Sequence, residues 1–387
     1  MKKIGYFMGA ALLTLGSCTN EINEEGFVDK ANTISFNAYP NKTRAVEGDV
    51  TNDNMKDDNF GVFGYFRNSP YLYVLSEGSA KKAVEQKWNT TSSTWEYVTP
   101  SELKFWPDGS MDFYAYFPSS ENVTFEESNA NANANSNVMT ISNVNCSHDV
   151  LFAQKSTIYK DRVPLTFDHA FSKIQGLNIK VNGGNVADAN VQVIVSNIEF
   201  INTSTSGNVI VNNEGKATYS VAQTNVPLTK SFPSAQTIDK SVTSGVDLIS
   251  SSDNCYLFAT NGRATKNVTG TNKTMWDGQQ SSLNSGKLSG LSNLVCLKLT
   301  CKVKDQIHYL VGSETENEYG VVYIPLTGTH NGTTTNLSAF EPGKRYTFNI
   351  VFTHNVGFKD NGDPILRPIL FNASVTGWED VTVTITL

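Results

Sequence analysis

The residue with the clearest chemistry is Cys18, which follows the sequence Leu15-Gly-Ser. Lys2 and Lys3 precede an apolar run over residues 4–15, and a positive start with a short apolar core is typical of a secretory signal. Such a run is too short for a permanent membrane span. A cysteine thiol at this place can be acylated, and several acyl chains anchor a protein firmly. The pattern predicts a signal peptide over residues 1–17 and lipidation of Cys18, so that the rest of the chain is exported.

The other residues with catalytic or ligand chemistry do not combine into a site. Five histidines stand apart from one another and from cysteine at any metal-ligand spacing: His148, His169, His308, His330 and His354. His169 follows an aspartate and has the setting of a base, but a structural histidine at a strand end is the stronger interpretation. Serine elbows and glycine-rich phosphate loops are absent from the sequence. We therefore predict no enzyme, no metal ion and no cofactor.

The charge excludes another class of partner. Without residues 1–17 the chain keeps 28 basic and 37 acidic residues, a net charge of -9. An acidic chain without a Lys/Arg cluster lacks the positive surface that neutralises phosphates, so nucleic acid is excluded as a partner. The length of the exported part is enough for two ordinary domains.

The elements that would position these residues are strands. Alternating or continuous runs of β-forming residues recur between Gly, Asn, Asp, Ser and Pro clusters, without a long amphipathic helix. About fifteen such runs predict an all-β fold of sandwiches or barrels. Aromatic clusters dominate residues 59–118, whereas later strands are aliphatic and rich in threonine. This change favours a division near residues 155–165.

Four further cysteines follow Cys18: Cys146, Cys255, Cys296 and Cys301. Cys296 and Cys301 share one strand-like run, and their odd offset places them on opposite faces, so they should not pair with each other. Cys301 is in register with apolar neighbours and is expected to be a buried small apolar residue. The disulfide state of the other three stays open.

Several motifs occur in a characteristic order along the chain: Ile34-Ser-Phe-Asn-Ala38, Phe60-Gly-Val-Phe-Gly-Tyr65, Phe105-Trp-Pro107, Met111-Asp-Phe-Tyr-Ala-Tyr-Phe-Pro118, Asp149-Val-Leu-Phe-Ala153 and Val163-Pro-Leu-Thr-Phe-Asp-His-Ala-Phe-Ser-Lys-Ile174. Together with the lipidation signal, they resemble the fimbrillin-like surface lipoproteins, or type V pilins, of anaerobic Gram-negative bacteria. The resemblance implies two tandem transthyretin-like (Greek-key) β-sandwich domains, over residues 45–162 and 163–387. It also implies a structural and adhesive subunit of cell-surface fimbriae.

The resemblance implies a mechanism of assembly as well. A trypsin-like or arginine-specific protease would remove residues 18–44, with the cut between Arg44 and Ala45. The removed segment includes a first strand whose Ile34, Phe36 and Ala38 fill a groove. A strand from another fimbrial subunit would then enter that groove by β-strand addition. Before maturation the lipid would hold the chain at the outer membrane, facing the outside.

The strand that such a chain would donate is open. The C-terminus alternates perfectly, with Val381, Val383, Ile385 and Leu387 on one face and threonines on the other. This segment has the pattern of a donor strand, but the last strand of the C-terminal sandwich is the favoured interpretation. The position of the subunit, in a stalk, at a tip or at an anchor, is open too.

A second function fits the sequence less well. A surface lipoprotein that binds glycan or a host ligand, and never polymerises, would keep its first strand. Its Trp106, Trp276 and Trp378 would form an exposed platform, whereas in a fimbrial subunit they should pack inside. The exposure of these side chains separates the two functions.

Overall fold

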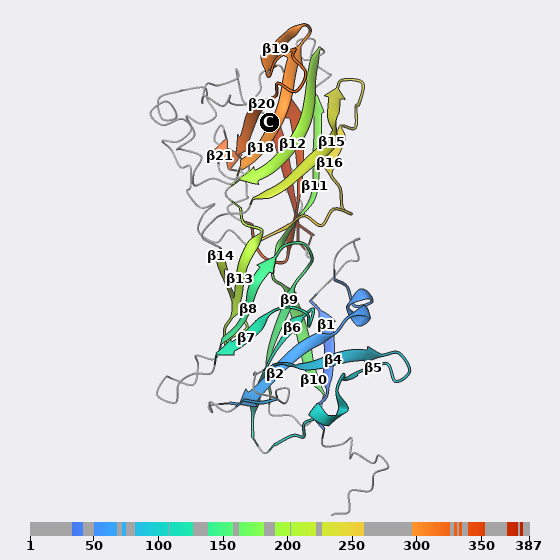
Figure 1. The fold of residues 1–387 in the computed structure, drawn as a ribbon, viewed down its shortest axis with the longest axis vertical. Coiled ribbons are helices and arrows are strands. Elements are labelled where there is room, and N and C mark those ends of the chain that lie inside the picture. Colours follow the sequence, from blue (N-terminus) through green and yellow to red (C-terminus); the bar gives the residue numbers. More distant parts are fainter. Residues whose placement is uncertain are drawn as a thin grey trace, which may run out of the picture.

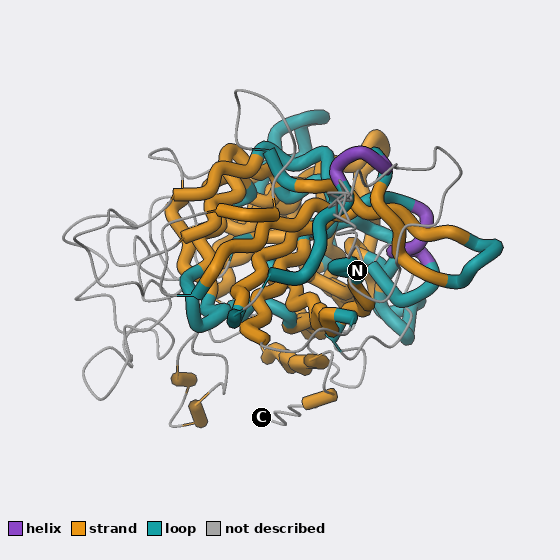
Figure 2. The backbone as a smooth tube through the Cα atoms, turned by 90° about the horizontal axis from the view of Figure 1, so that it is seen from below, coloured by secondary structure: helices purple, strands orange, loops and turns teal. Residues whose placement is uncertain are grey.

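In a computed structural model of the chain, the structure describes the following residues: 33–41, 50–67, 72–74, 82–107, 109–126, 138–157, 162–181, 190–201, 203–221, 227–258, 296–325, 329–330, 333–334, 340–352, 370–377 and 380–381. Strands make up most of this part, and the helical segments found in it are two short 3-10 turns, η2 (Asn54–Asp57) and η3 (Pro100–Glu102). Figure 2 shows that strands, drawn in orange, account for most of the described chain. The predicted all-β fold is confirmed, while the transthyretin-like topology stays a prediction.

An eight-stranded sheet lies in the lower half of the molecule in Figure 1. Its strands, in spatial order, are β1 (Phe36–Pro40), β10 (Val163–His169), β9 (Leu151–Thr157), β6 (Met111–Phe117), β2 (Phe60–Phe66), β4 (Val84–Asn89) and β5 (Thr94–Tyr97), and β3 (Leu72–Val74) pairs with β2. The two edge strands, β1 and β5, also contact each other. The sheet therefore curls until its edges meet around one core.

Both faces of this sheet are covered, which explains the continuous aromatic runs. Phe60 and Phe113 face the core inside the curl, whereas Phe63 and Tyr114 face a second core on the outside. Gly64 lies opposite Phe113 in the β2–β6 ladder, and a Cβ at Gly64 would come within 2.8 Å of the Phe113 ring. Glycine is thus required there because an aromatic ring lies against the backbone.

The outer core is shared with a four-stranded sheet. This sheet has the order β14 (Ala217–Val221), β13 (Ser206–Val211), β8 (Val138–Asn145) and β7 (Val123–Glu126). Met139 and Ile141 of β8 and Val209 of β13 are buried against the aromatic face of the larger sheet. Two sheets packed face to face in this way form a sandwich.

The upper half of the molecule is a second sandwich (Figure 1). One sheet has the order β16 (Val246–Ile249), β11 (Ser172–Val181), β23 (Lys344–Phe352), β24 (Leu370–Gly377) and β25 (Asp380–Val381), with β17 (Tyr256–Leu257) beside β11. The other has β15 (Leu228–Asp239), β12 (Val191–Ile201), β18 (Cys296–Asp305) and β19 (His308–Val311), with β20 (Gly320–Pro325) beside β18. A two-stranded pair, β21 (Thr329–His330) and β22 (Thr333–Thr334), completes the set. Buried aliphatic residues from both sheets, such as Val193 and Ile350, fill the space between them.

Strand pairing crosses the division that the sequence analysis placed between residues 162 and 163. β10 lies beyond that division but belongs to the lower eight-stranded sheet. β13 and β14 follow β12 in the chain, yet they return to pair with β8 in the lower half. The sequence could not reveal this return because each strand carries the same alternating pattern, whichever sheet it joins.

Candidate functional site

Strand β1 is held in place as a buried edge strand. It runs parallel to β10, with Phe36 opposite Val163 and Pro40 opposite Phe167. The side chains of Ile34 and Phe36 are fully buried, whereas the alternate residue Asn37 is exposed. β1 therefore fills the inner core with one face and shows the other to solvent.

The ring of Phe36 sits in an aromatic well. It meets Phe113 edge to face at 5.5 Å between centroids and Phe60 at 6.3 Å. Phe60 in turn contacts Trp95 and Phe167. Burial of one such side chain contributes roughly 1.5 to 3 kcal/mol, and each edge-to-face pair adds about 0.5 to 1.5 kcal/mol. The well makes Phe36 the main anchor of the strand.

The outer edge of β1 is capped by side chains and one loop carbonyl. The Tyr97 hydroxyl donates to the carbonyl of Ile34 at 3.0 Å, and Trp95 Nε1 donates to the carbonyl of Ala38 at 3.4 Å. The N–H of Ile34 donates to the carbonyl of Lys104. Burial raises the pKa of the Tyr97 phenol well above its ordinary value of 10.0, so it remains a donor even in alkaline solution. These groups stand where a neighbouring strand would be, and they block further pairing at this edge.

The predicted cut lies between Asn41 and Val50, and both of these residues are hydrogen-bonded near the C-terminal end of β10. Asn41 donates from its N–H to the Phe167 carbonyl at 2.6 Å and from Nδ2 to Oδ1 of Asp168 at 2.7 Å. The N–H of Val50 donates to Oδ2 of Asp149 at 3.4 Å. The chain thus leaves the sheet at residue 41 and returns to the same region at residue 50.

Asp149 is also the partner of His169, which the sequence analysis singled out. Nδ1 of His169 lies 2.6 Å from Oδ2 of Asp149, and both side chains are buried. Asp168, the neighbour in sequence, instead accepts the bond from Asn41. His169 therefore joins β10 to the turn before β9, as the structural interpretation predicted.

A pocket of about 350 Å³ opens beside the start of the strand. It is lined by residues 33–35, by Trp95 and Tyr97 of β5, by Leu103 and by Arg162. The capped edge of β1 is thus reachable from solvent at its N-terminal end. Chemically, the arrangement can hold an extended peptide through main-chain bonds on one side and two side-chain donors on the other.

Several predicted site residues lie outside the described residues: Cys18, Arg44, Ala45, Val383, Ile385 and Leu387. Lipidation and cleavage therefore stay predictions. Val381 is described as part of β25, where it pairs with Val375 of β24. At this point the C-terminal segment is a strand of the chain's own sheet.

Trp106 and the cysteines are buried. The Trp106 side chain is 5% exposed and meets the Phe113 ring edge to face, so Trp106 offers no exposed platform, while Trp276 and Trp378 lie outside the described residues. Cys146, Cys255 and Cys301 are free and buried. Burial raises the pKa of the Cys255 thiol to about 11 and that of Cys301 further, which makes both unreactive. The expectation for Cys301 is confirmed.

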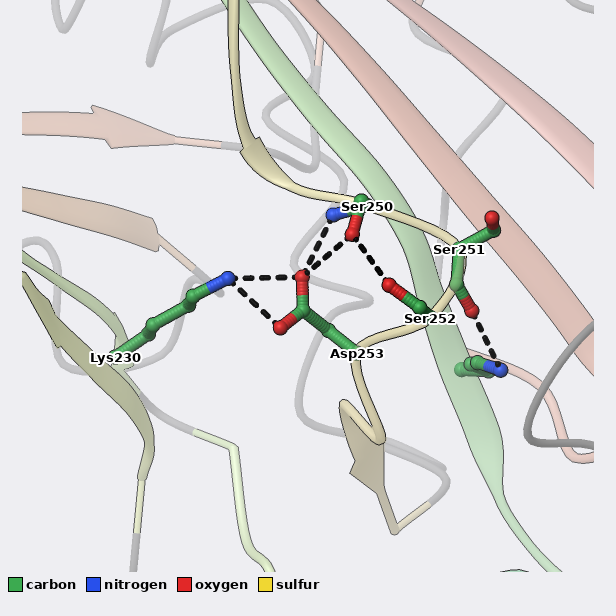
Figure 3. A network of polar contacts seen from close by, with 6 residues as sticks. Lys230, Ser250, Ser251, Ser252 and Asp253 are labelled. Carbon is green, nitrogen blue, oxygen red and sulfur yellow. Dashed lines mark hydrogen bonds and ion pairs between the residues drawn. The ribbon is translucent and has the colours of Figure 1, made fainter.

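A polar network in the upper half links its two sheets (Figure 3). Lys230 of β15 lies 2.8 Å from both carboxylate oxygens of Asp253, which also accepts bonds from the N–H and Oγ of Ser250. Burial pushes the pKa of Asp253 upward, but the bonds from Lys230 and Ser250 outweigh it and the pKa is lowered. The donors of Lys230 and Ser250 are thus used by contacts that hold the two sheets together.

The part of the chain that the structure describes has no helix long and apolar enough to cross a membrane. Over the same residues, no three His, Cys, Asp or Glu side chains gather where they could hold a metal ion.

The roles of Trp95, Tyr97, Asn41 and Asp149 were not predicted from the sequence. The run Thr94-Trp-Glu-Tyr97 does carry a signal, because its two aromatic residues fall on one face of a short strand and both have a polar tip. Their target, the backbone of residues 34–38, lies about 60 residues earlier in the chain, and no local pattern indicates it.

Solved structures that resemble this chain include fimbrial and cell adhesion proteins of Bacteroides. No curated protein matches it. Among solved structures, a fimbrial protein from Bacteroides vulgatus is 16% identical, with 90% of this chain and 99% of that chain covered and a TM-score of 0.44. A candidate cell adhesion protein from Bacteroides uniformis is 14% identical, with 91% and 99% covered and a TM-score of 0.42.

A third solved structure, of a candidate polysaccharide binding protein from Bacteroides thetaiotaomicron, is 9% identical, with 90% and 96% covered and a TM-score of 0.32. A family model described as fimbrillin-like matches residues 43–378, which is most of the sequence. The chain belongs to the fimbrillin-like family.

Proposed function

We propose that this chain is a subunit of adhesive cell-surface fimbriae, exported as a lipoprotein on Cys18 and assembled by strand exchange at the site of β1. Cleavage between Arg44 and Ala45 separates β1 from the rest of the chain. The strand then leaves, and a strand of another subunit takes its place. The outer membrane holds the precursor, and the fimbrium holds the mature subunit.

The observation that carries the proposal is the way β1 is held. One face of β1 is buried in the core, yet within the described residues β1 pairs with a single strand, by a parallel ladder to β10. Its loss would leave the β10 edge unpaired and the aromatic well of Phe60 and Phe113 open. An exposed edge beside an apolar groove is a template for another strand.

The test compares residues 19–387 with Arg44 intact and with Arg44→Ala. Both chains are treated with an arginine-specific protease under native conditions, and the new N-terminus and the oligomer size are read. We expect the wild type to begin at Ala45 and to form multimers or accept an added strand, while Arg44→Ala stays intact and monomeric. A wild type that is cut before Ala45 and neither accepts a strand nor forms multimers contradicts the proposal.

The lipid anchor is tested separately. In cells given labelled palmitate, the wild type should be labelled and retained in the membrane fraction, whereas Cys18→Ala should not. Label on the Cys18→Ala chain would assign the lipid to another residue.

The alternative is a surface protein that binds glycan and keeps β1. A polar cleft of about 440 Å³, lined by Glu85, Glu102, Glu121 and Tyr116, could accept hydrogen bonds from sugar hydroxyls. The burial of Trp106 removes one of the three platform residues that this function would use. It becomes the better account if the cleaved chain fails to take up a strand.

A further inference from the structure

The chain carries two alternating apolar strands of different chemistry. The inward residues of the first are Ile34, Phe36, Ala38 and Pro40, that is, one aliphatic, one aromatic, one small and one imino residue. Those of the C-terminal segment, Val381, Val383, Ile385 and Leu387, are all branched aliphatic residues. A groove that selects its strand by the shape of the inward side chains would distinguish these two segments.

The rings of Phe60 and Phe113, which form the well around Phe36, are themselves packed against other residues. Phe113 lies against Gly64 and also meets Trp106 edge to face at 5.9 Å. Phe60 meets Trp95 at 4.9 Å and Phe167 at 5.5 Å. Rings packed on several sides cannot relax inward to fill the space that a smaller occupant leaves, and the cost of such a substitution grows with the remaining cavity. A valine or isoleucine at this position would leave part of the well empty.

The position of Ala38 is defined by an indole. Trp95 Nε1 donates to the Ala38 carbonyl, while the Trp95 ring packs against Phe60 and Trp88. Four residues before Ala38, the Ile34 carbonyl accepts a hydrogen bond from the Tyr97 hydroxyl. These two donors bind carbonyls four residues apart, and the side chain midway between them, here Phe36, enters the well between Phe60 and Phe113.

We infer that the groove left by β1 selects a strand from a different polypeptide, with an aromatic side chain at the second inward position, and discriminates against the chain's own C-terminal strand. The chain then accepts a donor of another kind and does not polymerise with itself. This inference rests on the proposed function, because it needs a vacated groove.

The test measures binding of synthetic peptides to the chain after cleavage and removal of β1. The probes are a peptide of residues 33–41, the same peptide with Phe36→Val, a control with the outward change Asn37→Ser, and a peptide of residues 379–387. We expect the native and Asn37→Ser peptides to bind alike. The Phe36→Val and C-terminal peptides should bind at least about tenfold more weakly, the scale of a lost aromatic anchor.

The outcomes separate the two proposals. If no peptide binds, including residues 33–41, the strand-exchange function fails. If the C-terminal or Phe36→Val peptide binds as tightly as the native one, strand exchange stands and the selectivity is wrong. If the cleaved chain does not remain folded, the same substitutions are made in the uncut chain and its thermal midpoint is measured. Phe36→Val should lower the midpoint, and Asn37→Ser should not. An unchanged midpoint for Phe36→Val overturns the inference.

Discussion

The side-chain amide of Gln86 lies fully buried in the core that β1 completes. Gln86 is paired across the sheet with Phe60, which contacts Phe36 of β1, and with Tyr97, which donates to Ile34 just before β1. Within the described residues neither Oε1 nor Nε2 of Gln86 has a hydrogen-bond partner. An unsatisfied buried amide costs about 1 to 3 kcal/mol. Gln86 thus lowers the stability of the uncut chain at the place where we propose that a strand is exchanged.

We therefore expect Gln86→Met to raise the free energy of unfolding of the uncut chain by about 1 to 3 kcal/mol, because an apolar side chain of similar size removes the unsatisfied amide. Denaturant unfolding measures the change. Gln154→Met on β9 is the matched control, since its Nε2 already donates to Ser156 at 2.9 Å. A loss of stability in Gln86→Met would mean that the amide has a partner in solution.

His148 gives a pH dependence whose direction follows from its contact. Nε2 of His148 lies 2.7 Å from Oε1 of Glu121, and this hydrogen bond raises the pKa of His148 above its ordinary value of 6.5. A histidine whose pKa is raised on folding stabilises the folded state by its full amount when the pH is below its pKa in the unfolded chain. This stabilisation disappears as the pH rises through its pKa in the folded chain.

His148→Gln should therefore lower stability near pH 5 and have little effect near pH 9. The loss should stay below about 1 kcal/mol because the pair is partly exposed. Thermal midpoints across this range measure it, with the exposed His308→Gln as the control. An equal loss at both pH values would show that packing, and not the charge, accounts for the effect.

At the scale of elements, β1 and β10 depend on each other. The ladder between β10 and β9 covers Asp168 and His169, whereas β1 pairs with residues Val163 to Phe167. β1 thus supplies the neighbouring strand for the first part of β10. Separation of β1 should loosen β10 as well.

Hydrogen exchange tests this dependence. After cleavage and removal of β1, amides of residues 163–167 should lose most of their protection, while those of β6, which pairs with both β2 and β9, should keep it. Addition of the peptide of residues 33–41 should restore protection in β10. Unchanged exchange in β10 would show that it is held without β1.

Individual strands could be predicted from the sequence, but their partners could not. The continuous aromatic run at β2 fits a strand that is buried on both faces, and the alternating run at β1 fits a strand that is buried on one face. The parallel partner of β1 lies over 120 residues away, and the bonds from Trp95 and Tyr97 depend on the curl of the sheet. Likewise, the return of β13 and β14 to the lower half is a property of tertiary packing, which alternation along a strand does not encode.

At the scale of the whole molecule, the two halves share a junction but keep separate cores. Phe171, Tyr256 and Phe258 pack together where β11 begins, and they belong to the outer core of the lower half. Among the described residues, the core of the upper sandwich contains no residue of β1, nor any that belongs to the core β1 completes. Removal of β1 therefore takes apolar contacts from the lower half alone.

This separation predicts two thermal transitions after cleavage. The lower half should melt first because it has lost Ile34 and Phe36, which together contribute roughly 3 to 6 kcal/mol of burial. The upper sandwich should melt as in the uncut chain. Calorimetry gives the midpoints, and hydrogen exchange at β12 and β18 identifies the upper half. If β12 and β18 lose protection together with β10, the halves unfold as one unit and the upper sandwich cannot act as a stable support while the groove awaits its strand.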